Sequence, residues 1–408
     1  MDNSRTYRDK IEPLPIKDVT AKCIAQLKGV PFARALEGFK VPPDLLADKL
    51  IPQANESIFH NLYINEPILR DGKLDITRTD LFPNYQGRLF EVTYHDKVQL
   101  VLVGFSNDLD VQNSPALPFL LYIPPNPQDS PGDHRKRFPH LYAKVADKDI
   151  PFYYQNDADY PYAWDWLFLQ CYTNMYRLSY QLKKSNKPYV FVVPLVRSFS
   201  DGIGLLNDGA LLERCLVGIH KLYFDEKMGA GNYILADVQR IVLASFSIGD
   251  TILSNFLLRN RETSLVHDKI EQLIVLDPPF GNPNNRSPII NTIISIMRGS
   301  KNKSVFLYTQ DAYYVQPLIN TFLTPKGIPF NLSKQKIFSD EKLREVFFAY
   351  LDDKLFIEDI QDPLLHDAHH TFPNLFINNA LVRNSLEFQN VNGRRRPIFS
   401  FLEWAPTR

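Results

Sequence analysis

The chain has 408 residues, of which 44% are hydrophobic and 23% are charged, and 46 Lys and Arg residues balance 46 Asp and Glu residues. This composition is typical of a globular protein with a large core. Zero net charge argues against a general nucleic-acid-binding protein, which needs an excess of cations facing phosphate. The N-terminus is polar, and no apolar run has the roughly 18 residues of a membrane helix. We therefore expect a soluble, cytoplasmic protein without a signal peptide or a transmembrane segment.

Three cysteines, Cys23, Cys171 and Cys215, are spread over the chain. They are too few and too scattered for a disulfide framework or a zinc site. We expect reduced thiols, as in cytosolic proteins.

Residues 1–60 alternate short helical patterns with prolines and contain no catalytic grouping. They predict a mainly helical N-terminal extension with short helices over 18–27 and 43–50. Residues 61–390 are expected to form the main domain. Residues 391–408 are expected to form a C-terminal tail, which includes the basic run at 394–396.

The main domain begins with two strand patterns, 88–94 and 98–105, which predict a β-hairpin. Further strands are predicted over 116–123, 189–196, 241–244, 269–276, 304–309 and 334–338. Helices are predicted over 162–184, 208–224, 251–260, 289–297, 315–323, 340–351 and 374–386. This alternation predicts an α/β fold with a mostly parallel sheet and helices on both faces. In such sheets, functional groups lie at the carboxyl ends of the strands.

The strand at 241–244 runs into the sequence Ser-x-Ser-x-Gly and then into a helical pattern. Strand, tight turn and helix with a serine at the apex is the arrangement of a nucleophile elbow, which is strained and accepts only small residues two positions before and after the serine. Ser247 meets this requirement with Ser245 and Gly249. The backbone N–H of Ile248 would then be one oxyanion donor. A buried strand that enters a helix through a polar turn would give the same pattern.

Asp277 and Asp311 each follow a predicted strand, and His366, His369 and His370 precede the last predicted helix. A serine nucleophile needs a base, and imidazole suits that role because its pKa is near neutrality. An acid then orients the imidazole. The non-catalytic alternatives are a turn-initiating residue for Asp277, a helix N-cap for Asp311 and a solvent-exposed loop for the histidines. The histidine cluster could also belong to a metal site, but no carboxylate or cysteine pattern completes one.

From about residue 88 to 386 the chain resembles the α/β-hydrolase superfamily, with serine esterases and lipases as the nearest type. The elbow is degenerate, because Ser245 replaces the usual first glycine. The family's chain order is nucleophile, acid and histidine. The resemblance implies Ser247 as nucleophile, Asp311 as acid with Asp277 as the alternative, and His369 or His370 as base with His366 as the alternative.

The resemblance implies a serine hydrolase that cleaves an acyl or lipid-like ester through an acyl-enzyme. It implies no cofactor, and the run at 202–204 lacks the third glycine of a phosphate-binding loop. Two departures favour the alternative, a catalytically inactive α/β-hydrolase-fold binding or structural protein. Prolines after residue 123 offer no N–H as a second oxyanion donor. Asp250 also stands where the family often has a small residue, and we expect it at a surface position on the first helical turn. An acyltransferase with the same triad is a third reading.

Overall fold

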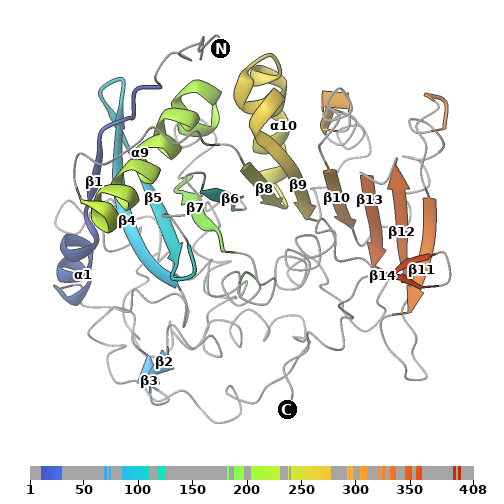
Figure 1. Ribbon diagram of the computed structural model, residues 1–408, viewed down its shortest axis with the longest axis horizontal. Coiled ribbons are helices and arrows are strands. Elements are labelled where there is room, and N and C mark those ends of the chain that lie inside the picture. The colour runs from blue at the N-terminus through green and yellow to red at the C-terminus, as the bar shows by residue number, and fades with distance from the viewer. Residues whose placement is uncertain are drawn as a thin grey trace, which may run out of the picture.

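One mixed sheet with helices beside it dominates the computed structural model (Figure 1). The structure describes residues 11–29, 69–70, 73–74, 85–109, 117–124, 182, 188–196, 204–229, 238, 240–276, 292–293, 295–296, 304–309, 320, 324–326, 331–336, 345–351, 355–360, 389–391 and 394–396. The chain therefore has an α/β fold, as the alternation of its sequence patterns predicts. Within these ranges, no helix is both long enough and apolar enough to cross a membrane.

The described elements of the first half of the chain are β1 (Ile16–Asp18), α1 (Thr20–Gly29), β2 (Leu69–Arg70), β3 (Lys73–Leu74), β4 (Tyr85–Tyr94), β5 (Lys97–Ser106), β6 (Pro118–Ile123) and β7 (Val190–Pro194). Those of the second half are η1 (Gly204–Leu206), α9 (Gly209–Met228), β8 (Arg240–Phe246), α10 (Gly249–Asn260), η2 (Leu265–Lys269), β9 (Ile270–Leu276), β10 (Ser304–Thr309), β11 (Asn331–Lys336), β12 (Glu345–Leu351), β13 (Leu355–Ile360), β14 (Gln389–Val391) and β15 (Arg394–Arg396).

Eleven strands form the main sheet in the order β1-β4-β5-β7-β6-β8-β9-β10-β13-β12-β11. The strands from β7 to β13 in this order are mutually parallel. Antiparallel pairs join β1, β4 and β5 at one side and β12 and β11 at the other. The prediction of a mostly parallel sheet thus holds for the centre, and the whole sheet is mixed.

The direction in which the chain crosses the sheet reverses between β6 and β8. After β6 the chain adds β7 on one side, whereas β8 is followed by β9 and β10 on the other side. At this boundary the carboxyl ends of β6 and β8 are in register, with Ile123 opposite Ser245. In open α/β sheets, ligand sites form in the crevice at such a switch point. The end of β8 is therefore the place in this fold where a site is expected.

The central strands are buried on both faces. Leu121 and Leu243 pack in a hydrophobic cluster to which both α9 and α10 contribute. Leu120 and Val242, which point to the opposite face, are also buried. Figure 1 shows α9 beside β1, β4 and β5 and α10 beside β8 and β9. Burial on both faces explains why these strands appear as continuous apolar runs in the sequence.

Helices α9 and α10 are tied together where α10 ends and α9 begins. The N–H of Gly209 donates to Asn260 Oδ1 at 2.8 Å, and Asn260 Nδ2 donates to the carbonyl oxygen of Phe256 at 2.9 Å. Asp208 is the N-cap of helix α9, since its Oδ1 accepts from Ala210 N–H at 2.8 Å. The contacts of Asn260 hold the end of α10, the helix that follows the predicted elbow, against the start of α9.

The predicted hairpin is confirmed as β4 and β5. Its two-residue turn consists of His95 and Asp96, whose φ angles are 43° and 60°. Positive φ at both turn residues is what a tight hairpin requires to match the twist of its strands.

The helix predicted over 340–351 is wrong, because residues 345–351 form strand β12. This segment pairs with β11 and with β13, a strand that the sequence patterns do not predict. The run from Val346 to Tyr350 is rich in aromatic side chains, which favour strands, and pairing with the strands on either side of it in the chain, β11 and β13, decides between the two structures. The helices predicted over 43–50, 162–184, 289–297, 315–323 and 374–386 lie outside the described residues, apart from a few single positions.

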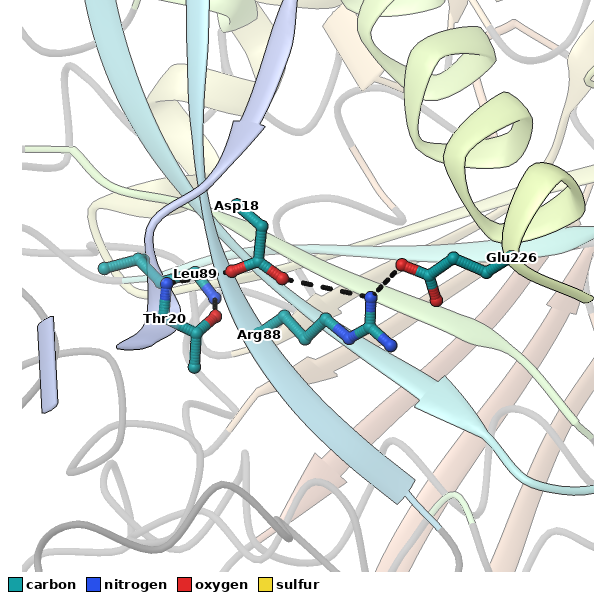
Figure 2. A network of polar contacts seen from close by, with 5 residues as sticks. All are labelled: Asp18, Thr20, Arg88, Leu89 and Glu226. Atoms are coloured by element: carbon teal, nitrogen blue, oxygen red, sulfur yellow. Dashed lines mark hydrogen bonds and ion pairs between the residues drawn. The ribbon is translucent and has the colours of Figure 1, made fainter. Parts of the chain in front are cut away.

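The N-terminal segment joins the main sheet, because β1 pairs with β4. Figure 2 shows Arg88 of β4 between Asp18 of β1 and Glu226 of α9. Arg88 Nη1 forms an ion pair with Glu226 and lies 3.9 Å from Asp18 Oδ2. The hydrogen bond that the Arg88 guanidinium donates to Glu226 raises the pKa of Arg88. Thr20 Oγ1 accepts from Leu89 N–H at 2.9 Å, so the beginning of α1 is held to the same strand.

We expect Arg88→Met to lower the free energy of unfolding by about 1–2 kcal/mol, because it removes a charge-assisted hydrogen bond to α9 together with the ion pair to β1. The Arg88 side chain is only 18% exposed. Arg240→Met is the matched control, since Arg240 pairs with Glu271 but is 65% exposed. We expect less than about 0.5 kcal/mol for the control. Equal losses in urea titrations of the two variants would contradict this account.

Burial raises the pKa of the Cys215 thiol from its ordinary value of 9.0 to about 12. Above pH 9 the unfolded chain ionises this thiol while the native protein keeps the proton, so native stability falls as the pH rises toward 12. In Cys215→Ala this loss is absent. The stability advantage of wild type over the variant should shrink by about 1.4 kcal/mol per pH unit above about pH 9. Parallel stability–pH curves from chemical denaturation would disprove the assignment.

Candidate functional site

Ser247 occupies the turn between β8 and α10 and has a φ angle of 55°. Residues with a Cβ atom rarely adopt this left-handed conformation. Its N–H donates to the carbonyl oxygen of Leu276, the last residue of β9, at 2.9 Å. Its own carbonyl oxygen accepts from Asp250 N–H at 3.0 Å. The turn therefore has the strained backbone that the sequence predicts for an elbow, and such strain concentrates at functional sites.

Gly249 explains why a small residue is needed two positions after Ser247. A Cβ atom at this position would lie 2.8 Å from the carbonyl oxygen of Ile123 and 2.9 Å from that of Pro124. Both obstacles are backbone atoms at the end of β6, so they cannot rotate away as a side chain would. The elbow is thus pressed against the neighbouring strand at the switch point.

Asp250 is fully buried, and the predicted surface position is wrong. Its Oδ1 accepts a hydrogen bond from the hydroxyl of Ser245, which is also fully buried. A buried carboxyl group needs such partners, and the start of a helix is a favourable place for negative charge. The sequence holds a signal for this burial, because Asp250 shares its helix face with Leu253 and Leu257 at spacings of three and four residues.

Ser247 and Ile248 are partly exposed, although Phe246 and Gly249 on either side of them are buried. The serine can therefore be approached from solvent. In the described part of the chain, the N–H of Ile248 has no backbone acceptor. That N–H precedes the first turn of α10, where it can donate to an oxyanion formed beside Ser247.

The other predicted site residues lie outside the described residues: Asp277, Asp311, His366, His369 and His370. The strands that lead to the two aspartates are described. β9 ends at Leu276, one residue before Asp277, and β10 ends at Thr309, two residues before Asp311. Both strands are parallel to β8, so their carboxyl ends lie at the same edge of the sheet as the elbow.

Gly204, the last residue of the glycine pair at 202–204, has a packing role. A Cβ atom there would lie 1.9 Å from the Tyr94 hydroxyl and 2.4 Å from Gln99 Oε1. Gln99 Oε1 also accepts from Leu205 N–H at 2.9 Å, which holds this turn against the hairpin. Among the residues that the structure describes, no group of three His, Cys, Asp or Glu side chains is arranged to hold a metal ion.

The left-handed backbone at Ser247 should determine which substitutions at this position preserve the stability of the protein. We expect Ser247→Gly to be more stable than Ser247→Ala by about 1 kcal/mol, because glycine adopts positive φ without a steric penalty. Ser254 in the interior of α10 is the matched control. There the order should reverse, with glycine about 1 kcal/mol less stable than alanine. The same order at both positions in thermal or urea unfolding would show that Ser247 is not strained.

No protein-family model matches this chain, and no curated protein matches it. The functional assignment therefore depends on the geometry of the elbow and on the order of residues along the chain.

Proposed function

We propose that the protein is a serine hydrolase with an α/β-hydrolase fold that cleaves an acyl or lipid-like ester. The left-handed backbone of a partly exposed serine at the carboxyl end of β8 carries this proposal. Serine gains nothing in stability from that conformation, so its presence is best explained by the need to present the hydroxyl group.

The arrangement of the sheet supports the same family. An antiparallel hairpin, β4 and β5, precedes a parallel series of strands. Many α/β-hydrolase sheets begin in this way. Ser247 follows β8, a central strand of the parallel series, at the switch point, which is where a ligand site of such a sheet is expected.

In the proposed reaction, Ser247 Oγ attacks the ester carbonyl carbon while His369 or His370 accepts the hydroxyl proton. Ile248 N–H donates to the carbonyl oxygen as it becomes an oxyanion. The imidazolium then protonates the leaving alcohol, and the acyl group stays on Ser247. Water, activated by the same imidazole, releases the acid and restores the serine.

Asp311 remains the preferred acid, and Asp277 the alternative. Strand β10 is two strands away from β8, which corresponds to about 10 Å between backbones. An imidazole must fit between the nucleophile and the acid, and this separation leaves room for it. Strand β9 is the direct neighbour of β8, so an acid at its end starts only about 5 Å away. Such an acid would have to reach the histidine from the side.

Two observations favour the second candidate, a non-catalytic binding or structural protein with the same fold. Asp250 places a buried carboxyl group in the first turn after the elbow, where negative charge opposes an oxyanion. Pro124 directly follows β6 and has no N–H to donate as a second oxyanion contact. A hydrolase with one strong oxyanion donor would be slower by about 10²–10³-fold.

Labelling with a fluorophosphonate probe tests the proposal. We expect wild-type protein at neutral pH to be modified at Ser247, as identified by mass spectrometry of the labelled peptide. Ser247→Ala should not be labelled, whereas Ser254→Ala, a control on the helix that follows the elbow, should react like wild type. His369→Ala and His370→Ala should identify the base, since only one of them removes the labelling.

Circular dichroism of every variant separates loss of chemistry from loss of fold. A folded wild-type chain that resists the probe would rule out an activated serine and leave the non-catalytic protein as the conclusion. If labelling occurs, release of acyl product in water distinguishes a hydrolase from an acyltransferase, which would need another acceptor.

A further inference from the structure

We infer that Asp250 is a positioning residue for Ser247, acting through its hydrogen bond with Ser245. The consequence for reactivity depends on the proposed serine chemistry. The consequence for the geometry of the elbow does not, and it can be measured separately.

Asp250 contacts both sides of the elbow. Its backbone N–H donates to the carbonyl oxygen of Ser247 at 3.0 Å, and its side chain accepts from the hydroxyl of Ser245. Asp250 therefore connects the first turn of α10 both to the apex of the elbow, Ser247, and to the strand that precedes it. The strained residue, Ser247, is itself one of the two attachment points, and Ser245 is the other.

The strand side of this connection is rigid. Ser245 is opposite Ile123 of β6 and opposite Val275 of β9, so it lies within a continuous parallel ladder. Its side chain is fully buried. A hydroxyl group fixed in this way gives the first turn of α10 a stationary point of attachment.

The residue type at 250 shows why a directional contact matters. Leu253 and Leu257 occupy the same helix face and are fully buried, so an aliphatic side chain at 250 would suit the environment. Burying a carboxyl group costs free energy unless it is hydrogen-bonded. What the polar pair adds over apolar packing is direction, because a hydrogen bond weakens steeply when its angle changes.

Direction is what the proposed chemistry requires. Rotation of the first turn of α10 would move the N–H of Ile248, the proposed oxyanion donor, together with the Cα of Ser247. The backbone contact of Gly249 with the end of β6 prevents the turn from approaching that strand more closely. The Ser245–Asp250 bond holds the turn from the side of β8. Together they leave Ser247 and Ile248 in one orientation.

The experiment compares four single variants and one double variant by two measurements. The single variants are Asp250→Leu, Asp250→Asn, Ser245→Ala and Thr251→Val, and the double variant combines Ser245→Ala with Asp250→Leu. The first measurement is amide hydrogen exchange in peptides that cover 246–253, with the β4–β5 hairpin as an internal reference for global opening. The second is the second-order rate of fluorophosphonate labelling.

We expect Asp250→Leu and Ser245→Ala each to accelerate exchange at the elbow, but not in the hairpin, by about 10-fold, the equivalent of one hydrogen bond. Labelling should slow by a similar factor. Asp250→Asn should keep both the exchange rate at the elbow and the labelling rate near the wild-type values, since an amide oxygen can accept from the same hydroxyl group. Thr251→Val, a control at the next position, should leave both unchanged. Combining Ser245→Ala with Asp250→Leu should add little, because both remove the same bond.

If Ser245→Ala exchanges its elbow amides at the wild-type rate, the inference is overturned, even if Asp250→Leu does not fold. Failure of Asp250→Asn to rescue would also overturn it, because the negative charge and not the hydrogen bond would then matter. If the expected exchange pattern occurs in a protein that the probe never labels, the positioning of the elbow stands and the hydrolase proposal fails.

Discussion

The candidate site depends on one backbone conformation, the left-handed φ of 55° at Ser247. This conformation costs about 1–2 kcal/mol for a residue with a Cβ atom, so the surrounding structure must hold it in place. The N–H of Ser247 is bonded to the end of β9, and Gly249 lies against the end of β6. Because both neighbours of β8 are in contact with it, the turn cannot relax without displacing a strand of the central sheet.

The sheet and helix α10 can resist such strain because they are anchored at a distance from the site. Asn260 joins the end of α10 to the start of α9. The other end of α9 is held by Glu226, which pairs with Arg88 on β4 near the edge of the sheet. These contacts connect the helix after the elbow to the N-terminal strand β1 through one set of packed elements. A strained turn supported in this way keeps its shape when a ligand arrives, which is the condition for preorganised chemistry.

The pair formed by Ser245 and Asp250 bears on both proposed functions. In a hydrolase, a buried carboxyl group beside the oxyanion site is unfavourable unless its position serves the geometry of the elbow. In a binding protein, the same pair would stabilise a turn that no longer needs to react. The pair therefore supports the shape of the turn in either case and does not by itself indicate catalysis. The strain at Ser247 favours a functional role for the turn.

Local patterns in the sequence determined the hairpin of β4 and β5, the N-cap at Asp208 and the succession of strand, turn and helix around Ser247. These features depend on residues within a few positions of one another. Only the tertiary structure decided that residues 345–351 form strand β12, that Asp250 is buried against Ser245, and that Gly204 must make room for Tyr94. Each of these outcomes is set by atoms from segments that the backbone brings together. The helix face that Asp250 shares with Leu253 and the aromatic run of 346–350 favour two of these outcomes locally, but they do not decide them, because burial and pairing are properties of the assembled sheet.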